Sequence, residues 1–141
     1  MQIVKTRFGE VEVDPNTVLT FPLGLPGFEP CTRFKLLHED KPQPKILWLQ
    51  SLDEPALAFS VVTSELLGVN YQIQLSDEEC ELLQLEEPDD VTLLLVLARP
   101  PEEGDRPISA NTQAPLIINS KSRLGLQKTG LQADIVFRNA I

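Results

Sequence analysis

Short apolar stretches separated by turn-forming residues follow one another along most of the chain. Stretches of about four to eight residues bounded by Gly, Pro, Asn, Asp or Ser are typical of β-strands. The first two stretches flank Phe8-Gly9 and another pair flanks Asp53-Glu54-Pro55, so each pair is expected to form a hairpin. We expect strands at residues 3–6, 10–13, 18–21, 33–37, 46–52, 56–62, 71–75, 91–98, 115–119 and 134–137.

Residues 91–98 form the longest apolar run in the chain. The run is too continuous for an exposed edge strand, so we expect a central strand. Residues 71–75 instead alternate apolar and polar positions, as in a strand with one face in water. The longest run is far short of the roughly 18 apolar residues of a membrane-spanning helix. Residues 1–7 also lack the apolar core of a signal peptide, so we expect a cytoplasmic protein.

One segment has the pattern of a helix. Ser76-Asp77-Glu78-Glu79 forms a capping box, with Ser76 as the N-cap residue and Glu79 as the third helical residue. The acids of the first turn favour the positive end of the helix dipole. Pro88 is expected to end a helix of about three turns near residues 76–86. The apolar side of this helix would consist of Cys80, Leu82, Leu83 and Leu85.

Residues 63–67 are expected to form one further helical turn. Many short strands with one helix predict a mainly β fold, either a small antiparallel β-barrel or a sandwich. A chain of 141 residues suits one domain of this kind, so residues 1–141 are expected to form a single domain.

Acidic residues dominate the charge of the protein. Lys and Arg number 12 and Asp and Glu number 21, which gives a net charge of −9. Residues 76–106 hold 11 of the acids and only 2 bases, so this block accounts for the whole net charge. The charge argues against direct binding of nucleic acid, which requires a basic surface, and against docking on anionic lipid. It is compatible with a basic protein partner.

Residues that carry catalytic or metal chemistry are sparse. His38 is the only histidine, and Cys31 and Cys80 are far apart, so we expect free thiols and no metal site. No Gly-x-Ser-x-Gly motif occurs, and Gly24-Leu25-Pro26-Gly27 lacks the Lys-Ser/Thr of a phosphate-binding loop. Paired acids such as Glu102-Glu103 are expected on a solvated face. We therefore expect neither an enzyme nor a cofactor, and only a deep pocket with convergent polar groups would favour a ligand-binding barrel.

The segment from Phe21 to Glu29 reads Phe-Pro-Leu-Gly-Leu-Pro-Gly-Phe-Glu. Its two prolines fix φ and its two glycines permit positive φ, so we expect a rigid loop. Phe21, Leu25 and Phe28 are expected to anchor this loop in the body of the protein. The loop serves either as a packed turn or as a contact surface for a partner.

Two further segments place polar amide side chains next to apolar residues. Strand alternation puts Trp48 and Gln50 on one face of residues 46–52, and a buried Gln50 would need hydrogen-bond partners that fix its register. We expect Trp48 in the core. Asn111 and Asn119 flank an apolar stretch that precedes Gly125-Leu126-Gln127, and their amides either cap turns or form a binding constellation.

Together these segments resemble the flagellar assembly factor FliW family, whose pattern looks like F-P-x-G-L-P-G-F-E, L-Q-S, A-N-x-x-A-P-[IVL]-I-N and G-x-Q. The matching residues are 21–29, 49–51, 111–119 and 125–127, so the resemblance spans nearly the whole chain. It implies a small β-barrel-like fold in the bacterial cytoplasm and no catalytic activity. It also implies two protein partners, flagellin and the RNA-binding translational repressor CsrA (carbon storage regulator).

The resemblance implies a partner switch. Unexported flagellin occupies the factor, and export frees the factor to bind CsrA and relieve repression of flagellin synthesis. The family is thought to contact CsrA away from its RNA-contacting surface, so the antagonism would be allosteric. The alternative is a chaperone dedicated to flagellin that does not bind the repressor. Thr112-Gln113 departs from the apolar pair of many relatives, which would alter affinity if this pair lies in an interface.

We expect the protein to be a monomer. The candidate partner-binding residues come from the family segments and from the acidic block. They are Phe21, Pro22, Gly24, Leu25, Pro26, Gly27, Phe28, Glu29, Gln50, Asn111, Pro115, Asn119, Gln127, Glu78, Glu79, Glu86 and Glu87.

Overall fold

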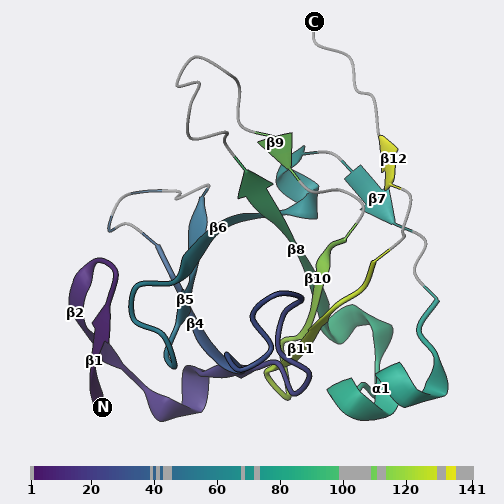
Figure 1. Ribbon diagram of the computed structural model, residues 1–141. Coiled ribbons are helices and arrows are strands. Elements are labelled where there is room, and N and C mark those ends of the chain that lie inside the picture. The colour runs from purple at the N-terminus through teal and green to yellow at the C-terminus, as the bar shows by residue number, and fades with distance from the viewer. Residues whose placement is uncertain are drawn as a thin grey trace, which may run out of the picture.

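Seven strands of the computed structural model close into a barrel (Figure 1). Around the ring they follow the order β10-β11-β3-β4-β5-β6-β8, and β8 pairs with β10 to complete it. The structure describes residues 2–38, 40, 42, 46–67, 69–71, 74–98, 109–110, 114–129 and 133–135. The barrel strands are β3 (Leu19–Thr20), β4 (Arg33–Leu37), β5 (Leu47–Ser51), β6 (Ala58–Thr63), β8 (Val91–Ala98), β10 (Leu116–Asn119) and β11 (Leu124–Gln127).

The expectation of a mainly β fold is confirmed, and the architecture is a barrel rather than a sandwich. Neighbouring barrel strands are antiparallel except β11 and β3, which run parallel through Leu124 and Thr20. This contact joins the start of β11, the chain's last barrel strand, to the end of β3, its first. The sequence did not predict β11 as a strand, although its residues belong to one of the family segments.

The remaining elements surround the ring. The predicted opening hairpin is confirmed as β1 (Gln2–Thr6) and β2 (Gly9–Val13), and β5 and β6 form the second predicted hairpin. The other strands are β7 (Val69–Tyr71), β12 (Ala133–Ile135), which pairs with β7, and β9 (Ser109–Ala110), which pairs with β8. The helical elements are η1 (Pro15–Thr17), η2 (Ser64–Leu67), α1 (Asp77–Leu83) and η3 (Pro88–Asp90).

Several predicted boundaries are wrong. The strand expected at 71–75 is observed as β7 over Val69–Tyr71, and Gln74 and Leu75 lie outside any strand, next to the N-cap of α1, while residues 72–73 lie outside the described residues. The strand expected at 134–137 begins one residue earlier, and residues 136–137 lie outside the described residues. The helix ends at Leu83 rather than near Pro88, because Gln84 adopts the left-handed conformation (φ 52°).

The end of α1 has the hydrogen bonds of a Schellman motif. The N–H of Leu85 donates to the carbonyl oxygen of Cys80, and the N–H of Gln84 donates to that of Glu81. The predicted capping box at the other end is confirmed, with Ser76 and Glu79 exchanging hydrogen bonds of 3.1 and 2.9 Å. The helix is therefore about two turns long and leaves part of the barrel wall beside it uncovered.

The side chains of the barrel strands divide between an inner and an outer core. The inner core fills the barrel and consists of Leu19, Phe21, Leu25, Phe34, Leu49, Val61, Leu94, Leu116 and Ile118. The outer core lies where α1 packs on the wall and is centred on Leu83, Ile117 and Leu126. On β10, Ile117 points outward between the inward-pointing Leu116 and Ile118.

The packing around β8 explains why its sequence is a continuous apolar run. Leu94 faces the barrel interior, whereas Leu95 packs with Val62 and Tyr71 on the outside, and Val91 and Leu93 pack against the outer core. The expectation of a central strand is confirmed, since β6 and β10 pair with its two edges.

Candidate functional site

The loop from Phe21 to Glu29 closes one end of the barrel. Phe21 is fully buried and meets Phe34 edge to face, with ring centroids 5.4 Å apart. The Phe21 ring also occupies the space beside Gly125, where a Cβ atom would lie 2.7 Å from it. The first and last family segments therefore depend on each other, because a side chain at position 125 would displace Phe21.

The same loop is held in shape by its own backbone. Gly24 has a φ of +69°, and a Cβ atom there would lie 2.5 Å from the backbone of Glu29. The N–H of Gly24 donates to the carbonyl oxygen of Phe21 at 2.8 Å, and that of Phe28 donates to Leu25 at 2.7 Å. The Glu29 carboxylate accepts a hydrogen bond of 3.2 Å from the N–H of Gly27.

Anchoring of this loop is confirmed for Phe21 and Leu25 but is only partial for Phe28. The Phe28 side chain is 40% exposed and lies edge to face on Phe59, at 5.4 Å between centroids. Leu23 is 68% exposed at the other side of the loop. The candidate contact residues that this loop leaves at the surface are Pro22, Pro26, Gly27, Phe28 and Glu29.

Gln50 is buried and fully hydrogen-bonded. Its amide Nε2 donates to the carbonyl oxygens of Ser51, Pro55 and Leu57, and its Oε1 accepts from the N–H of Arg7 at 3.1 Å. The expectation that a buried Gln50 needs partners and fixes the local register is confirmed. The residue ties the turn of the β1–β2 hairpin to the β5–β6 loop, so it acts within the fold.

Trp48 lies on the same face of β5 as Gln50, beneath the opening hairpin. It is half-buried and meets Phe8 edge to face at 5.1 Å, so the expectation of a core position is wrong. The reason is that the β1–β2 hairpin covers the outer wall of the barrel only in part. Trp48, Phe8 and Leu37 line a small apolar cavity of about 300 Å³ there.

Asp53 fixes the turn that follows β5. Its carboxylate accepts hydrogen bonds from the N–H groups of Thr32 and Arg33 and from the Arg33 guanidinium at 2.9 Å. Burial raises the pKa of Asp53, but the hydrogen bonds from the Arg33 and Thr32 backbone and from the Arg33 guanidinium outweigh it and lower the pKa below 3.8. Ser51 Oγ accepts from the N–H groups of Asp53 and Glu54 in the same turn.

Asn119 joins β10 to the end of α1. Its buried Nδ2 donates to the carbonyl oxygens of Leu83 and Gln84, at 2.9 and 3.2 Å. Its Oδ1 accepts from the N–H groups of Lys121 and Ser122. Of the two interpretations of the Asn amides, the capping role holds for Asn119.

The other residues of that segment divide into two groups. Pro115 is fully buried, and Gln127 is half-buried and donates from Nε2 to the carbonyl oxygen of Ala114 at 3.0 Å. Asn111 and the departing pair Thr112-Gln113 lie outside the described residues.

The acidic candidates also differ in their surroundings. Glu78, Glu86 and Glu87 are exposed. Glu79 is half-buried and binds Lys128, with 2.7 Å between Oε1 and Nζ. The hydrogen bonds from Lys128 and from the N–H of Ser76 hold the pKa of Glu79 below its ordinary value of 4.5. Glu79 therefore ties the start of α1 to the end of β11, whereas the other three acids are available at the surface.

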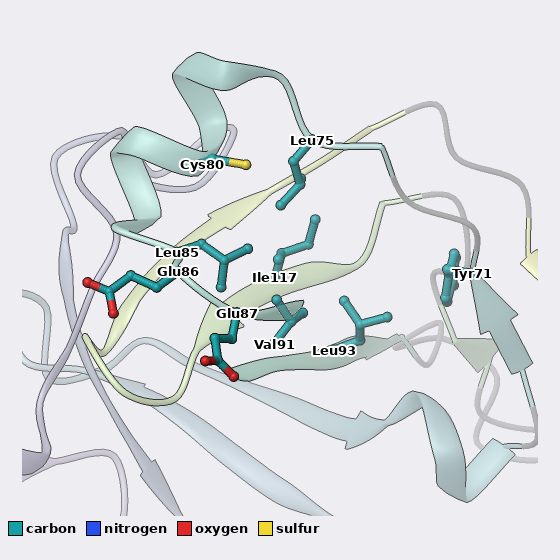
Figure 2. Close-up of a pocket in the computed structure, with 9 residues that line it drawn as sticks. All are labelled: Tyr71, Leu75, Cys80, Leu85, Glu86, Glu87, Val91, Leu93 and Ile117. Carbon is teal, nitrogen blue, oxygen red and sulfur yellow. The ribbon is translucent and has the colours of Figure 1, made fainter. Parts of the chain in front are cut away.

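An apolar groove runs between α1 and the barrel wall (Figure 2). Its volume is about 550 Å³, and its apolar lining consists of Leu75, Leu85, Val91, Leu93 and Ile117. Tyr71 lies at one end, and the Cys80 sulfur faces the groove from α1. Glu86 and Glu87 form the rim at the other end, where the chain leaves α1.

The sequence analysis did not identify this groove. Its lining combines the consecutive elements β7, α1 and β8 with the distant strand β10, and each apolar residue of the lining is an ordinary hydrophobic position when taken alone. A signal was present in the unbroken apolar pattern of residues 91–98, since its outer face requires a cover. The two turns of α1 cover only part of that face.

A disulfide, a metal site and a membrane-spanning helix each place requirements on the described residues. Both cysteines are free and half-buried, as expected. Within the described ranges, no three His, Cys, Asp or Glu residues are placed to hold a metal ion. No helix among those ranges has the length and apolar character needed to cross a membrane.

Fold and site together define a small, mainly β barrel with one flanking helix and an apolar groove beside it. The model of the FliW protein family matches residues 2–139, and the chain belongs to this family. A flagellar assembly factor FliW from Chromobacterium violaceum is 47% identical over 96% of this chain and 97% of its own length. Another, from Azoarcus sp. (strain BH72), is 44% identical over 98% of both chains.

A solved structure of the same kind agrees with the fold. The crystal structure of a flagellar assembly factor FliW superposes with a TM-score of 0.75 at 33% sequence identity, covering 91% of this chain and 88% of that chain. The family resemblance drawn from the three sequence segments is thereby confirmed. The relatives are named as assembly factors, and their names describe no reaction.

Proposed function

We propose that this protein is a non-enzymatic regulator of flagellar assembly in the bacterial cytoplasm that binds the translational repressor CsrA. Binding antagonises the repressor allosterically and relieves repression of flagellin synthesis, and flagellin is the competing partner. The observation that carries this proposal is the exposed acidic face formed by Glu78, Glu86 and Glu87 on a chain of net charge −9 within the FliW family. A repressor that holds RNA needs a basic surface, which complements this face.

The first experiment is a calorimetric titration of the protein with CsrA from the same organism. It is run at low and high salt, with and without saturating flagellin. We expect binding that weakens as salt rises, because contacts between exposed charges are screened. Flagellin should abolish it. Absence of repressor binding at every salt concentration would contradict the proposal.

A second experiment asks whether the acidic face steers the encounter. Glu86→Lys with Glu87→Lys should slow association with CsrA by about tenfold at low salt, because long-range attraction acts mainly on the association rate. The matched control is Glu10→Lys with Glu12→Lys, which makes the same charge change on exposed positions of β2. Equal association rates for the two double variants would remove the acidic face from the mechanism.

A flagellin-dedicated chaperone that does not bind the repressor is the second candidate. The apolar lining of the groove beside α1 favours it, since an apolar contact tolerates salt. In the titration this function would appear as flagellin binding that persists at high salt, with no heat on addition of CsrA.

A further inference from the structure

The groove beside α1 has an apolar floor that the described residues leave partly open. Ile117 is fully buried at the bottom, but Leu75, Leu85, Val91 and Leu93 are only partly buried. A volume of about 550 Å³ lies in the range of cavities that bury most of a bound small ligand, so it takes the side chains of several residues. Figure 2 shows these side chains converging between α1 and the strands below it.

The floor is the face of a sheet and not its edge. Strands β8 and β10 lie under the groove and pair with each other through Val91–Asn119, Leu93–Ile117 and Leu94–Leu116. Their backbone groups on that side are therefore already satisfied. A segment that enters the groove meets side chains only and must satisfy its own backbone hydrogen bonds. A helix does this, and it places apolar residues at i, i+3 or i+4, and i+7 on one face.

The rim of the groove selects the charge of that helix. Glu86 and Glu87 are exposed there, and the ion pair of Glu86 with Lys121 spans 3.9 Å between side chains more than two-thirds exposed. No ion pair of Glu87 occurs among the residues that the structure describes. Two carboxylates at the lip of an apolar groove complement Lys or Arg beside an apolar stripe.

We infer that the groove is a docking site for an amphipathic helix of another protein, with an apolar stripe seated on Leu93 and Ile117 and basic residues facing Glu86 and Glu87. This inference deepens the proposed function, because it names the kind of segment that a protein partner inserts beside α1. It depends on neither partner named above, since it rests on the lining, the pairing of the floor strands and the charge of the rim.

The test uses synthetic helical peptides and the intact protein. The probe is a 15-residue peptide with Leu at the i, i+3, i+4 and i+7 positions and Lys beside that stripe. One control peptide replaces each Lys by Glu, and another has the composition of the probe with the stripe scrambled. Fluorescence polarisation of labelled peptides gives the affinities. We expect the probe to bind at least tenfold more tightly than either control peptide.

Protein variants locate the binding. The double substitution Glu86→Lys and Glu87→Lys should weaken binding of the probe at least tenfold, whereas Glu10→Lys with Glu12→Lys should leave it unchanged. Bound peptide should also slow the reaction of a thiol reagent with Cys80 in a Cys31→Ser variant. In a Cys80→Ser variant, the reaction of Cys31 should stay the same. Amide chemical shifts at Leu75, Leu93 and Ile117 give a second measure of position.

Four results would overturn the inference. Two concern affinity: equal binding of the probe and the scrambled peptide, and equal loss of binding in the two charge-reversed variants. The other two are unperturbed amides at Leu93 and Ile117 when the peptide is bound, and a circular dichroism spectrum showing that the bound peptide is extended. Because the peptides contain no sequence of CsrA or flagellin, these results are independent of the calorimetric titration. A result that overturns the groove as a docking site can therefore be distinguished from a result that overturns the proposed function.

Discussion

The two sides of the barrel differ in how completely they are filled. At the loop end, Phe21 is fully buried and Gly24 and Gly125 leave no space for a further carbon atom. On the α1 side, Leu75 and Leu93 are only partly covered, and a groove of about 550 Å³ lies beside the helix where it does not cover the strands. The loop end is thus a closed structural unit, whereas the α1 side offers an apolar surface with charged borders.

This difference separates the buried residues of the family segments from the exposed acids at the groove rim. Phe21, Gln50, Pro115 and Asn119 carry the family resemblance, and each is buried. The rim acids Glu86 and Glu87 belong to no family segment, and both are exposed. Substitutions in the two regions should therefore have different effects. Those at the loop end should change the free energy of unfolding, and those at the groove should change binding.

Gly24→Ala should have the largest effect. The new Cβ would lie 2.5 Å from the Glu29 backbone at a φ of +69°, so the loop must move and its strain adds to the clash. We expect a loss of about 4 kcal/mol in the free energy of unfolding, measured by urea denaturation. The control is Gly27→Ala, which has a φ of +87° but open space, and should lose only about 1 kcal/mol. Similar losses of unfolding free energy in Gly24→Ala and Gly27→Ala would show that the loop end is not closely packed.

Asn119→Ala should have the second largest effect, and it acts on the α1 side. The substitution removes the amide group that donates hydrogen bonds to the carbonyl oxygens of Leu83 and Gln84. Because Asn119 is buried, we expect a loss of about 2–3 kcal/mol in the free energy of unfolding. Gln127→Ala is the control, since it removes one hydrogen bond from a half-buried side chain and should cost about 1 kcal/mol.

Asn119→Ala also tests whether the two sides are separable. Hydrogen exchange should accelerate at the amides of α1, whereas the amides of β4 and β5 keep their protection, because local opening requires only the contacts of α1 to break. Uniform acceleration across the barrel would mean that α1 and the barrel open as one unit.

Local patterns in the sequence predicted the elements that depend on neighbouring residues. The capping box of α1, both hairpins and the central position of β8 are of this kind. Each follows from residues adjacent in the chain or from the period of one strand.

Features that join distant segments could not be predicted in this way. The parallel contact of β11 with β3 joins residues about a hundred positions apart. The groove combines four elements, and Trp48 is half-buried because the hairpin of β1 and β2 covers it incompletely. The end of α1 was misplaced because Gln84 takes a left-handed conformation, for which Gly or Asn is the usual sequence signal.

Glu79→Gln should have a moderate effect that depends on pH. Gln keeps the capping box but loses the ion pair with Lys128, whose two side chains are 24% and 23% exposed. We expect a loss of about 1 kcal/mol at pH 7. Because the folded protein lowers the pKa of Glu79 below 4.5, its contribution is complete above that pH and is lost as the pH falls through the folded pKa.

The measurement is the difference in the free energy of unfolding between the native protein and Glu79→Gln from pH 7 to pH 3. The difference should be constant down to about pH 5 and should shrink below the ordinary pKa of 4.5. The carboxyl of Asp53 also has a lowered pKa, but it is present in both proteins and cancels. If this difference in unfolding free energy grew as the pH fell, the ion pair of Glu79 with Lys128 could not be its source.

Glu86→Lys with Glu87→Lys should have the smallest effect on stability and the sharpest effect on binding. Both side chains are exposed, and the pair of Glu86 with Lys121 is a surface contact at 3.9 Å, so we expect a change within about 0.5 kcal/mol. Thermal melts of this variant and of Glu10→Lys with Glu12→Lys should therefore superpose. If only Glu86→Lys with Glu87→Lys then binds CsrA or the basic peptide more weakly, the α1 side is a binding surface. A large loss of stability would instead show that its rim, like the loop end, belongs to the fold.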